Sequence, residues 1–283
     1  EELLPQANAI RGVAMTGAWM LGPLIGGFSV GTWGIEVCLI LDVLTFAFSG
    51  LVLWTISEIP VEREENGNLR EEVAEAWSFV KTQPWLFAGI AMFMIWHIGD
   101  SAIEIGIPFI IENNGLGAKE FGIFGAVGAA GAMVGSVIGG IRPVSKEIRG
   151  LVFYVLIGGI AWCMLMWAMP IPFTLILVFV LLEGVLGGTL GVIWRTTMSD
   201  SVDQHLRGRV NSLDAIGSLV FIPLAPLMGG WMIEETNVLT TFAVAVSIMV
   251  LTTMAGLIVP SFRRFERVDS ELFPIKGDQS QSG

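Results

Sequence analysis

The sequence predicts an all-α fold, a polytopic membrane helix bundle with about eight transmembrane helices. Of its 283 residues, 53% are hydrophobic and 14% are charged, whereas about a quarter of the residues in a soluble domain are charged. Roughly 20 apolar residues are needed to cross about 30 Å of hydrocarbon, and eight runs of that length occur. The 35 glycines favour close helix packing, and ten tryptophans against one tyrosine suit interfacial anchors.

The eight apolar runs are joined, with one exception, by short connectors. We expect the transmembrane helices at Ala9–Val30, Gly34–Ile56, Pro84–Ile111, Phe121–Ile141, Gly150–Met169, Phe173–Trp194, Val210–Ile233 and Val238–Val259. Proline inside a helix removes a backbone donor and predicts a kink. Such prolines are Pro23 in the first run, Pro108 in the third, and Pro223 with Pro226 in the seventh.

The exceptional connector, Ser57–Gln83, is polar and charged. It opens with a flexible-looking stretch at Glu64–Asn68. Apolar residues then recur at helical spacing, which predicts an amphipathic helix on the membrane surface; they are Leu69, Val73, Ala76, Trp77 and Val80. The polar tail, Arg263–Gly283, is expected to be poorly ordered.

Basic residues predict the orientation of the bundle. Alternate connectors, together with the two ends of the chain, hold 14 of the 15 Lys and Arg residues, and the other connectors hold only Lys119. Because basic connectors stay inside the cell, we expect both ends of this chain to be cytoplasmic and the protein to lie in the cell membrane.

Charge, cysteine content and motifs exclude several classes of protein. The net charge of −11 argues against nucleic acid as a partner, because phosphate binding needs clustered Lys and Arg. With only Cys38, Cys163, His97 and His205 present, we expect no disulfide framework and no metal site. We find no His-Glu-x-x-His and no phosphate-cradling Gly-Lys motif, so we predict no enzyme activity and no cofactor.

Two distant segments repeat each other. Asn8-Ala9-Ile10 leads to Pro23-Leu24-Ile25-Gly26-Gly27, and Asn211-Ser212-Leu213 leads over the same interval to Pro226-Leu227-Met228-Gly229-Gly230. Both segments start on the predicted cytoplasmic side, so the repeat is parallel. Six helix starts separate the equivalents, and a six-helix unit used twice gives twelve helices. The first segment is then the fifth helix and the second is the eleventh.

These features resemble the major facilitator superfamily, and specifically its twelve-helix exporter branch, which includes macrolide- and siderophore-efflux proteins. The sharpest likeness is to the fifth-helix antiporter motif, carried here by Ala14, Ala18, Gly22, Pro23, Gly26 and Gly27. Further similar stretches are Leu206-Arg207-Gly208-Arg209, the segment from Phe79 to Leu86, and a degenerate basic loop motif between Gly139 and Gly150 that lacks its usual acidic residue.

The resemblance implies a domain organisation. Residues 1–57 would be the fifth and sixth helices, 58–83 a cytoplasmic linker, 84–262 the six-helix C-terminal half, and 263–283 a cytoplasmic tail. The chain begins at Glu1 without methionine or a signal peptide. We therefore expect a fragment, whose partners include the missing first four helices.

The antiporter motif also has a physical interpretation of its own. Ala14, Ala18, Gly22 and Gly26 are spaced by four, so they form a helix ridge with almost no side chain, which another backbone can approach closely. Together with a bend at Pro23, this ridge can seal one mouth of a transporter. Taken alone, the ridge favours ordinary tight packing without a coupling role, whereas the full Gly-Pro-x2-Gly-Gly sequence favours the exporter interpretation.

Ionisable residues inside the hydrocarbon cost about 3 kcal/mol each, so each calls for an explanation. Glu183 falls near the midplane, where a carboxyl group can carry a proton. Asp42 lies somewhat off-centre, and His97, Asp100 and Glu104 share one stripe of their helix. Structural hydrogen bonding, helix pairing or a water-filled outer mouth are the competing explanations. Arg207 and Arg209 form either a cytoplasmic gate or a simple topological signal.

The leading hypothesis is a secondary active transporter that exports a small amphiphilic solute, of the drug or siderophore class, as an antiporter coupled to protons. The kinked seventh and eleventh helices are its candidate moving elements. An importer or lipid transporter of the same fold with another coupling ion, and a non-transporting scaffold, remain alternatives.

Overall fold

A computed structural model describes residues 4–55, 69–203, 206–221, 223–258 and 260. All regular structure in these ranges is helical. The predicted flexible stretch, Glu64–Asn68, and the predicted tail, Arg263–Gly283, both lie outside these ranges. The helices are α1 (Leu4–Trp33), α2 (Ile35–Thr55), α3 (Leu69–Thr82), α4 (Pro84–Glu104), α5 (Ile107–Asn113), α6 (Ala118–Ile141), the 3₁₀ turn η1 (Lys146–Ile148), α7 (Arg149–Trp167), α8 (Phe173–Ser201), α9 (Arg207–Leu219), α10 (Ala225–Glu235) and α11 (Val238–Gly256).

Helices occupy each of the eight predicted spans, with a break inside the third span and another inside the seventh. Six helical segments within the described ranges are long and apolar enough to cross a membrane: α2, α4 with α5, α6, η1 with α7, α8 and α11. The first span, α1, is 30 residues long but less apolar over its length than these six. The seventh span corresponds to α9 and α10, each too short to cross alone.

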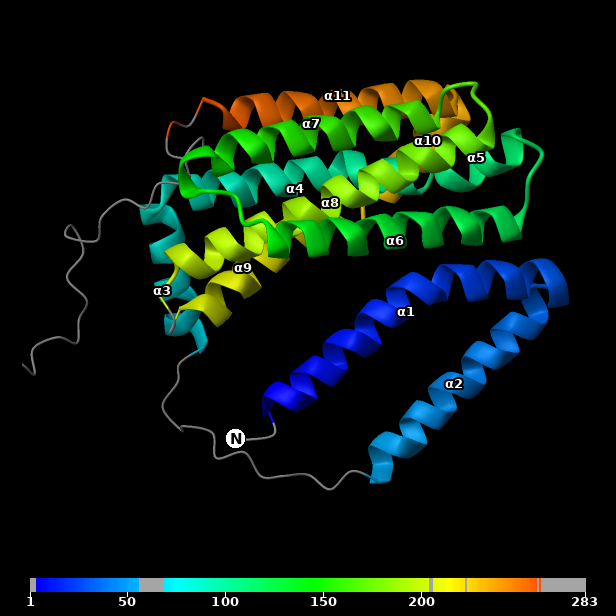
Figure 1. The fold of residues 1–283 in the computed structure, drawn as a ribbon, viewed down its shortest axis with the longest axis horizontal. Coiled ribbons are helices and arrows are strands. Elements are labelled where there is room, and N and C mark those ends of the chain that lie inside the picture. The colour runs from blue at the N-terminus through cyan, green and yellow to red at the C-terminus, as the bar shows by residue number, and fades with distance from the viewer. Residues whose placement is uncertain (1–3, 56–68, 204–205, 222, 259, 261–283) are drawn as a thin grey trace, which may run out of the picture.

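The predicted proline kinks are confirmed. Figure 1 shows α1 bent along its length, with Pro23 inside it. Pro108 lies in the first turn of α5, directly after the break that separates α5 from α4. The predicted span Val210–Ile233 is broken rather than only bent, because α9 ends at Leu219 and α10 begins at Ala225. Proline has no backbone N–H to continue a helix, but its fixed φ suits a first turn.

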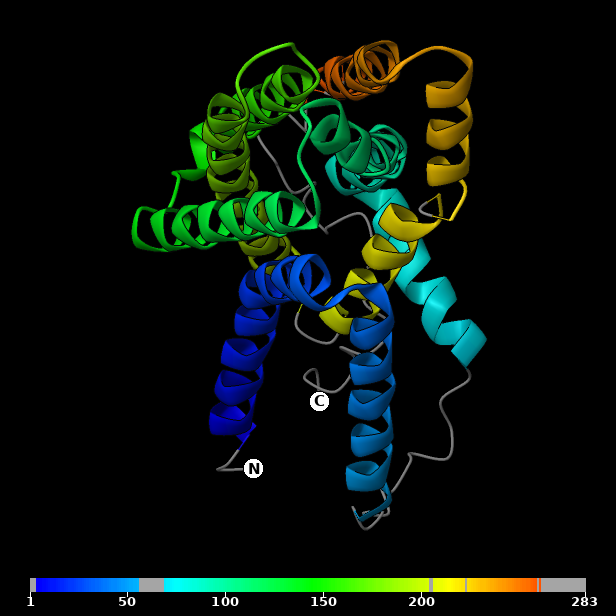
Figure 2. The same cartoon turned by 90° about the vertical axis from the view of Figure 1, so that its right-hand side faces the viewer.

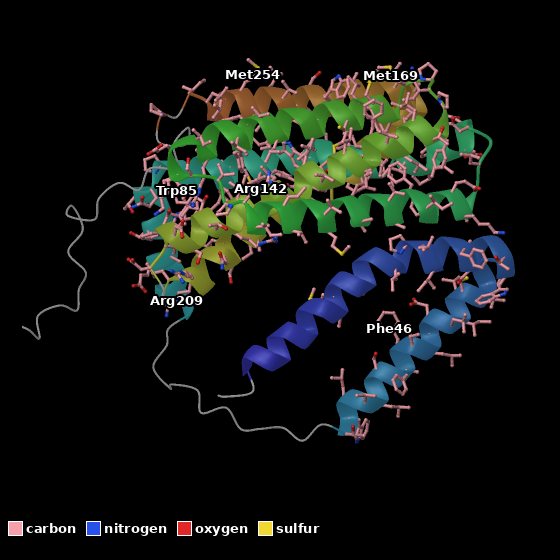
Figure 3. The ribbon with its side chains drawn as sticks, in the orientation of Figure 1. Phe46, Trp85, Arg142, Met169, Arg209 and Met254 are labelled. Carbon is pink, nitrogen blue, oxygen red and sulfur yellow. The ribbon has the colours of Figure 1, made fainter. Side chains whose placement is uncertain are left out.

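The bundle has two ends that differ in charge. Figure 3 labels Arg142, between α6 and α7, and Arg209, at the start of α9, at the same end. We call it the basic end, and the opposite end, where Met169 lies between α7 and α8, the far end. Figures 1 and 2 show α2 diverging from the other helices, and none of its residues is buried; Phe46 at its centre is 72% exposed.

The closest helix pair is α6 and α8. Gly131 and Gly135 of α6 press on the backbone of α8, and Gly184 and Gly188 of α8 press on the backbone of α6. A Cβ at Gly135 would collide with the Val185 carbonyl group. Small residues allow such approach, which replaces the hydrophobic driving force that lipid does not supply. The α6 glycine ridge therefore serves packing.

The predicted amphipathic helix is present as α3, but its apolar face is partly covered by protein. Ala76 and Val80 are fully buried, while Val73 and Trp77 are 48% and 41% exposed. The helix contacts α4 and α9 at the basic end. An ion pair between Glu75 Oε2 and Arg209 Nη1, 2.8 Å apart, adds to the contact with α9.

The α6–α8 contact predicts a position-specific loss of stability. Gly135→Ala forces backbone apart, so it should lower the free energy of unfolding by about 1 to 3 kcal/mol. Gly140→Ala on the same helix is the control, because a Cβ there meets nothing within 4 Å. Thermal unfolding in detergent measures both, and equal stability of the two variants would contradict the packing.

Candidate functional site

Three carboxyl groups of α4 and α8 lie close enough to interact electrostatically. Asp100 and Glu104 lie on one face of α4, and Glu183 projects from α8. Glu183 interacts electrostatically with Glu104, and Asp100 interacts with both. No ion pair within the described ranges neutralises any of the three. We call Asp100, Glu104 and Glu183 the acidic cluster.

Glycine explains how Glu183 fits inside α8. Gly184 and Gly188 hold one face of the helix against α6. Gly187 lies one turn beyond Glu183 on the same face, and Glu183 Oε1 lies 3.4 Å from the position that a Cβ at Gly187 would take. The Glu183 carboxyl group therefore lies directly beside the backbone of Gly187. The rigid α6–α8 contact thereby fixes the position of Glu183.

His97 lies one turn before Asp100 on α4. Its Nδ1 is 2.7 Å from the Phe93 carbonyl oxygen, and because a carbonyl only accepts, Nδ1 donates this bond. That leaves Nε2 to accept or donate elsewhere. The ring packs edge-on against Trp96, with centroids 5.4 Å apart, and it interacts electrostatically with Asp214 of α9. His97 is thus partly satisfied by its own helix and still faces a carboxyl group.

Asp214 is a candidate site residue that sequence reasoning missed. Its Oδ2 accepts a hydrogen bond from Trp194 Nε1 at 3.1 Å. Its Oδ1 is buried, and no group in the described part of the chain bonds to it. The signal was available, because Asp214 is an ionisable residue within the predicted span Val210–Ile233.

The acidic cluster, His97 and Asp214 form a line along the bundle. At 1.5 Å per residue, measured from the basic end of each helix, Asp214 lies about 10 Å deep and His97 about 20 Å deep. Asp100, Glu183 and Glu104 follow at about 24, 27 and 30 Å. We call these five residues the titratable line. It runs along the bundle on α9, α4 and α8.

Two other predicted groups lie apart from this line. Asp42 is exposed on α2, which packs only on α1 to any extent, so the structure does not bring it to the acidic cluster. Arg207 donates from Nε to the Val202 carbonyl at 2.9 Å, and Arg209 pairs with Glu75. Both arginines lie at the basic end, and their role as a gate stays a prediction.

The antiporter motif contacts α6 through its second half. A Cβ at Gly27 would lie 2.6 Å from Gly122 Cα, and a Cβ at Gly125 would lie 2.6 Å from Pro23 Cβ. Gly22 and Gly26 meet nothing within 4 Å, and Ala14 and Ala18 are exposed. The close approach therefore uses Pro23 and Gly27, whereas the predicted ridge of Ala14, Ala18, Gly22 and Gly26 faces open space. The contact lies in the far half, and Figure 1 shows α1 diverging from α6 toward the basic end.

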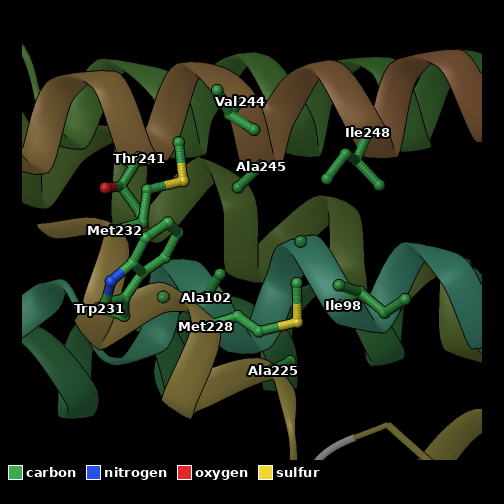
Figure 4. Close-up of a pocket in the computed structure, with 12 residues that line it drawn as sticks. Ile98, Ala102, Ala225, Met228, Trp231, Met232, Thr241, Val244, Ala245 and Ile248 are labelled. Atoms are coloured by element: carbon green, nitrogen blue, oxygen red, sulfur yellow. The ribbon is translucent and has the colours of Figure 1, made fainter. Parts of the chain in front are cut away.

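A cavity of about 110 Å³ lies between α4, α10 and α11 (Figure 4). Its lining is almost entirely apolar, and it includes the small residues Ala102, Ala225 and Ala245, with Met228 and Trp231 from α10. Because it has no ionisable lining residue, it is separate from the titratable line.

Comparison with known proteins gives the family. A family model described as the Major Facilitator Superfamily matches residues 1–218. Enterobactin exporter EntS of Escherichia coli O127:H6 (strain E2348/69 / EPEC) is 22% identical over 284 residues, which cover 96% of this chain and 65% of that protein. The proteins of the same name from Shigella boydii serotype 4 (strain Sb227) and Escherichia coli O1:K1 / APEC are each 23% identical, with the same coverage. No solved structure gives a significant match.

Fold and site together define a multi-pass α-helical membrane protein with ionisable groups in its interior. The chain belongs to the Major Facilitator Superfamily. It spans 65% of the length of the curated relatives named above.

The acidic cluster predicts a pH-dependent gain of stability on mutation. Glu183→Gln removes one of three mutually repelling groups, so it should raise the melting temperature. The gain should grow as pH rises, because only ionised carboxyl groups repel, by on the order of 1 kcal/mol per close pair. Thermal unfolding between pH 5 and pH 9 measures the effect. Glu112→Gln, at an exposed position of α5, should change nothing, and a destabilised Glu183→Gln variant at every pH would assign Glu183 a structural role.

Proposed function

We propose that this protein is a secondary active exporter that moves a small amphiphilic solute out of the cell while protons move inward. The observation that carries the proposal is the titratable line. A membrane-embedded carboxyl group is expensive and is retained where ions or protons pass. Five ionisable groups in sequence between α4, α8 and α9 offer successive proton acceptors. Packing alone would not require them.

The direction and the solute class rest on the relatives. The similar proteins are named enterobactin exporters, which supports efflux of a siderophore-like solute. The basic connectors support a cytoplasmic basic end in the plasma membrane, by the positive-inside rule. In this orientation the titratable line starts near the cytoplasm at Asp214 and ends toward the outside at Glu104.

The α1–α6 contact supports an outward seal. Pro23 and Gly27 meet Gly122 and Gly125 only in the far half, and the two helices separate toward the basic end. A close contact confined to the far half supports a state in which the far end is closed to the outside, the state in which an exporter loads its solute. The breaks in α4–α5 and α9–α10 give these elements the freedom to move during alternating access.

The first transport prediction concerns Glu183. In inside-out vesicles that contain the protein expressed from its complete reading frame, Glu183→Gln should reduce proton-driven solute movement to the level of vesicles without the protein. Glu112→Gln is the control and should retain transport. If Glu183→Gln vesicles transport normally and still respond to an uncoupler, Glu183 has no part in coupling. Transport that follows a sodium gradient instead would replace the proton with another ion.

The second transport prediction concerns the seal. Gly31 of α1 lies against the Lys119 side chain of α6, with its Cβ position 2.6 Å from Lys119 Cγ. A Gly31→Cys/Lys119→Cys pair, with Cys38 and Cys163 replaced by serine, should form a disulfide on oxidation. The disulfide should stop transport by locking the far end shut, and a reductant should restore it. Undiminished transport by fully cross-linked protein would show that this contact does not open.

A further inference from the structure

A second cavity, of about 210 Å³, lies between α8 and α9 near the basic end. Its lining differs from that of the apolar cavity, because it brings together two guanidinium groups, an amide and a carboxyl group beside an indole ring. The lining residues are Trp194, Arg195, Met198, Ser199, Arg207, Asn211 and Asp214. Convergent polar groups in a small cavity are typical of a ligand site.

Both arginines reach this cavity with donors to spare. The Arg195 guanidinium folds back along α8 toward the membrane interior, and its Nη2 lies 3.5 Å from the Cβ position of Gly191, one turn deeper. Arg207 commits its Nε to the Val202 carbonyl, which leaves its terminal nitrogens. Within the described ranges, neither arginine forms an ion pair. Two unpaired guanidinium groups attract an anion.

Asp214 supplies the opposite requirement. Trp194 holds its Oδ2, and its buried Oδ1 has no hydrogen-bond partner in the described part of the chain. A buried carboxylate oxygen without a donor is costly, and the described residues supply none, so an added ligand that carries a donor would satisfy it. An acidic group would repel a simple anion, but it accepts a hydrogen bond from a hydroxyl or amide group.

We propose that this cavity is an anion-binding site that selects a small anion carrying a hydrogen-bond donor on an apolar or aromatic body. Arg195 and Arg207 bind the negative charge, Asp214 Oδ1 accepts from the donor, and Trp194 and Met198 contact the apolar body. The assignment of the anion to the exported solute rests on the proposed function. The selectivity of the site is independent of it.

The test measures equilibrium binding of radiolabelled 4-hydroxybenzoate and benzoate to the purified protein in zwitterionic detergent. The wild type should bind 4-hydroxybenzoate about threefold or more tightly than benzoate, because only the former can donate to Asp214. Asp214→Asn keeps an acceptor for Trp194 but removes the charge, so benzoate binding should strengthen and the preference should fall.

Arginine variants test the charge. Arg195→Gln and Arg207→Gln should each weaken binding of both probes about tenfold. Arg142→Gln is the matched control, because it removes the same charge from the basic end outside the cavity, and it should change binding less than twofold. Equal weakening by all three variants, or no saturable binding by the wild type at millimolar probe, would overturn the site. Arg195→Gln leaves the hydrogen bond from Arg207 to the Val202 carbonyl in place. Weaker binding by this variant therefore cannot be due to misfolding caused by loss of that bond.

Two further arms identify the source of the anion. In nanodiscs, phosphatidylglycerol should not displace 4-hydroxybenzoate, and displacement would assign the site to a lipid headgroup and overturn the solute assignment. If the wild type binds 4-hydroxybenzoate but transports no solute in vesicles, the proposed function is rejected and the binding site stands. Transport that is unaffected by Arg195→Gln would reject the site's part in export alone.

Discussion

The backbone contact between α6 and α8 is the interaction on which the rest of this bundle depends. Helices in hydrocarbon gain little from burying apolar surface against one another, because lipid tails are equally apolar. Association therefore requires an approach that lipid cannot match. Gly135 and Gly188 provide it, since each places backbone directly on the partner helix. Thr189 adds hydrogen bonds from its hydroxyl to the Gly135 and Val185 carbonyls at 3.0 and 2.8 Å.

The same principle divides the bundle into a part joined by close backbone contacts and a part whose helices are broken. Glycine joins α1 to α6 at Gly27 and Gly122, so α1, α6 and α8 share one chain of close backbone contacts. Proline interrupts the helices on the other side, where α4 breaks before α5 and α9 breaks before α10. The titratable line lies where these two parts face each other. A shift of α4 or α9 against α8 would therefore change the distances between its carboxyl groups.

Sequence reasoning predicted the helices well and the site only in part. Apolar run length fixes where helices lie, and proline chemistry located both breaks. The stripe of His97, Asp100 and Glu104 followed from helical spacing, but spacing within one helix cannot show that Glu183 of α8 faces it. Nor could spacing show that Gly27, and not Gly26, contacts α6. Which of two neighbouring residues faces the partner depends on the rotation of α1 about its axis, and the partner helix sets that rotation. Asp214 was visible in its apolar run, but its significance comes from Trp194 and His97.

Opposite charges at the two ends of the interior give a physical reason for coupling. On the proposed function, an anion enters at the basic end, where Arg195 and Arg207 attract it. Its outward path then leads past the acidic cluster, which repels it as long as Asp100, Glu104 and Glu183 are ionised. Protons arriving from the outside neutralise these groups and remove the barrier. Protons thus load the acidic cluster from the outside, and the anion loads the cavity from the inside. The outward movement of the anion and the inward movement of the protons then depend on each other, as obligatory exchange requires.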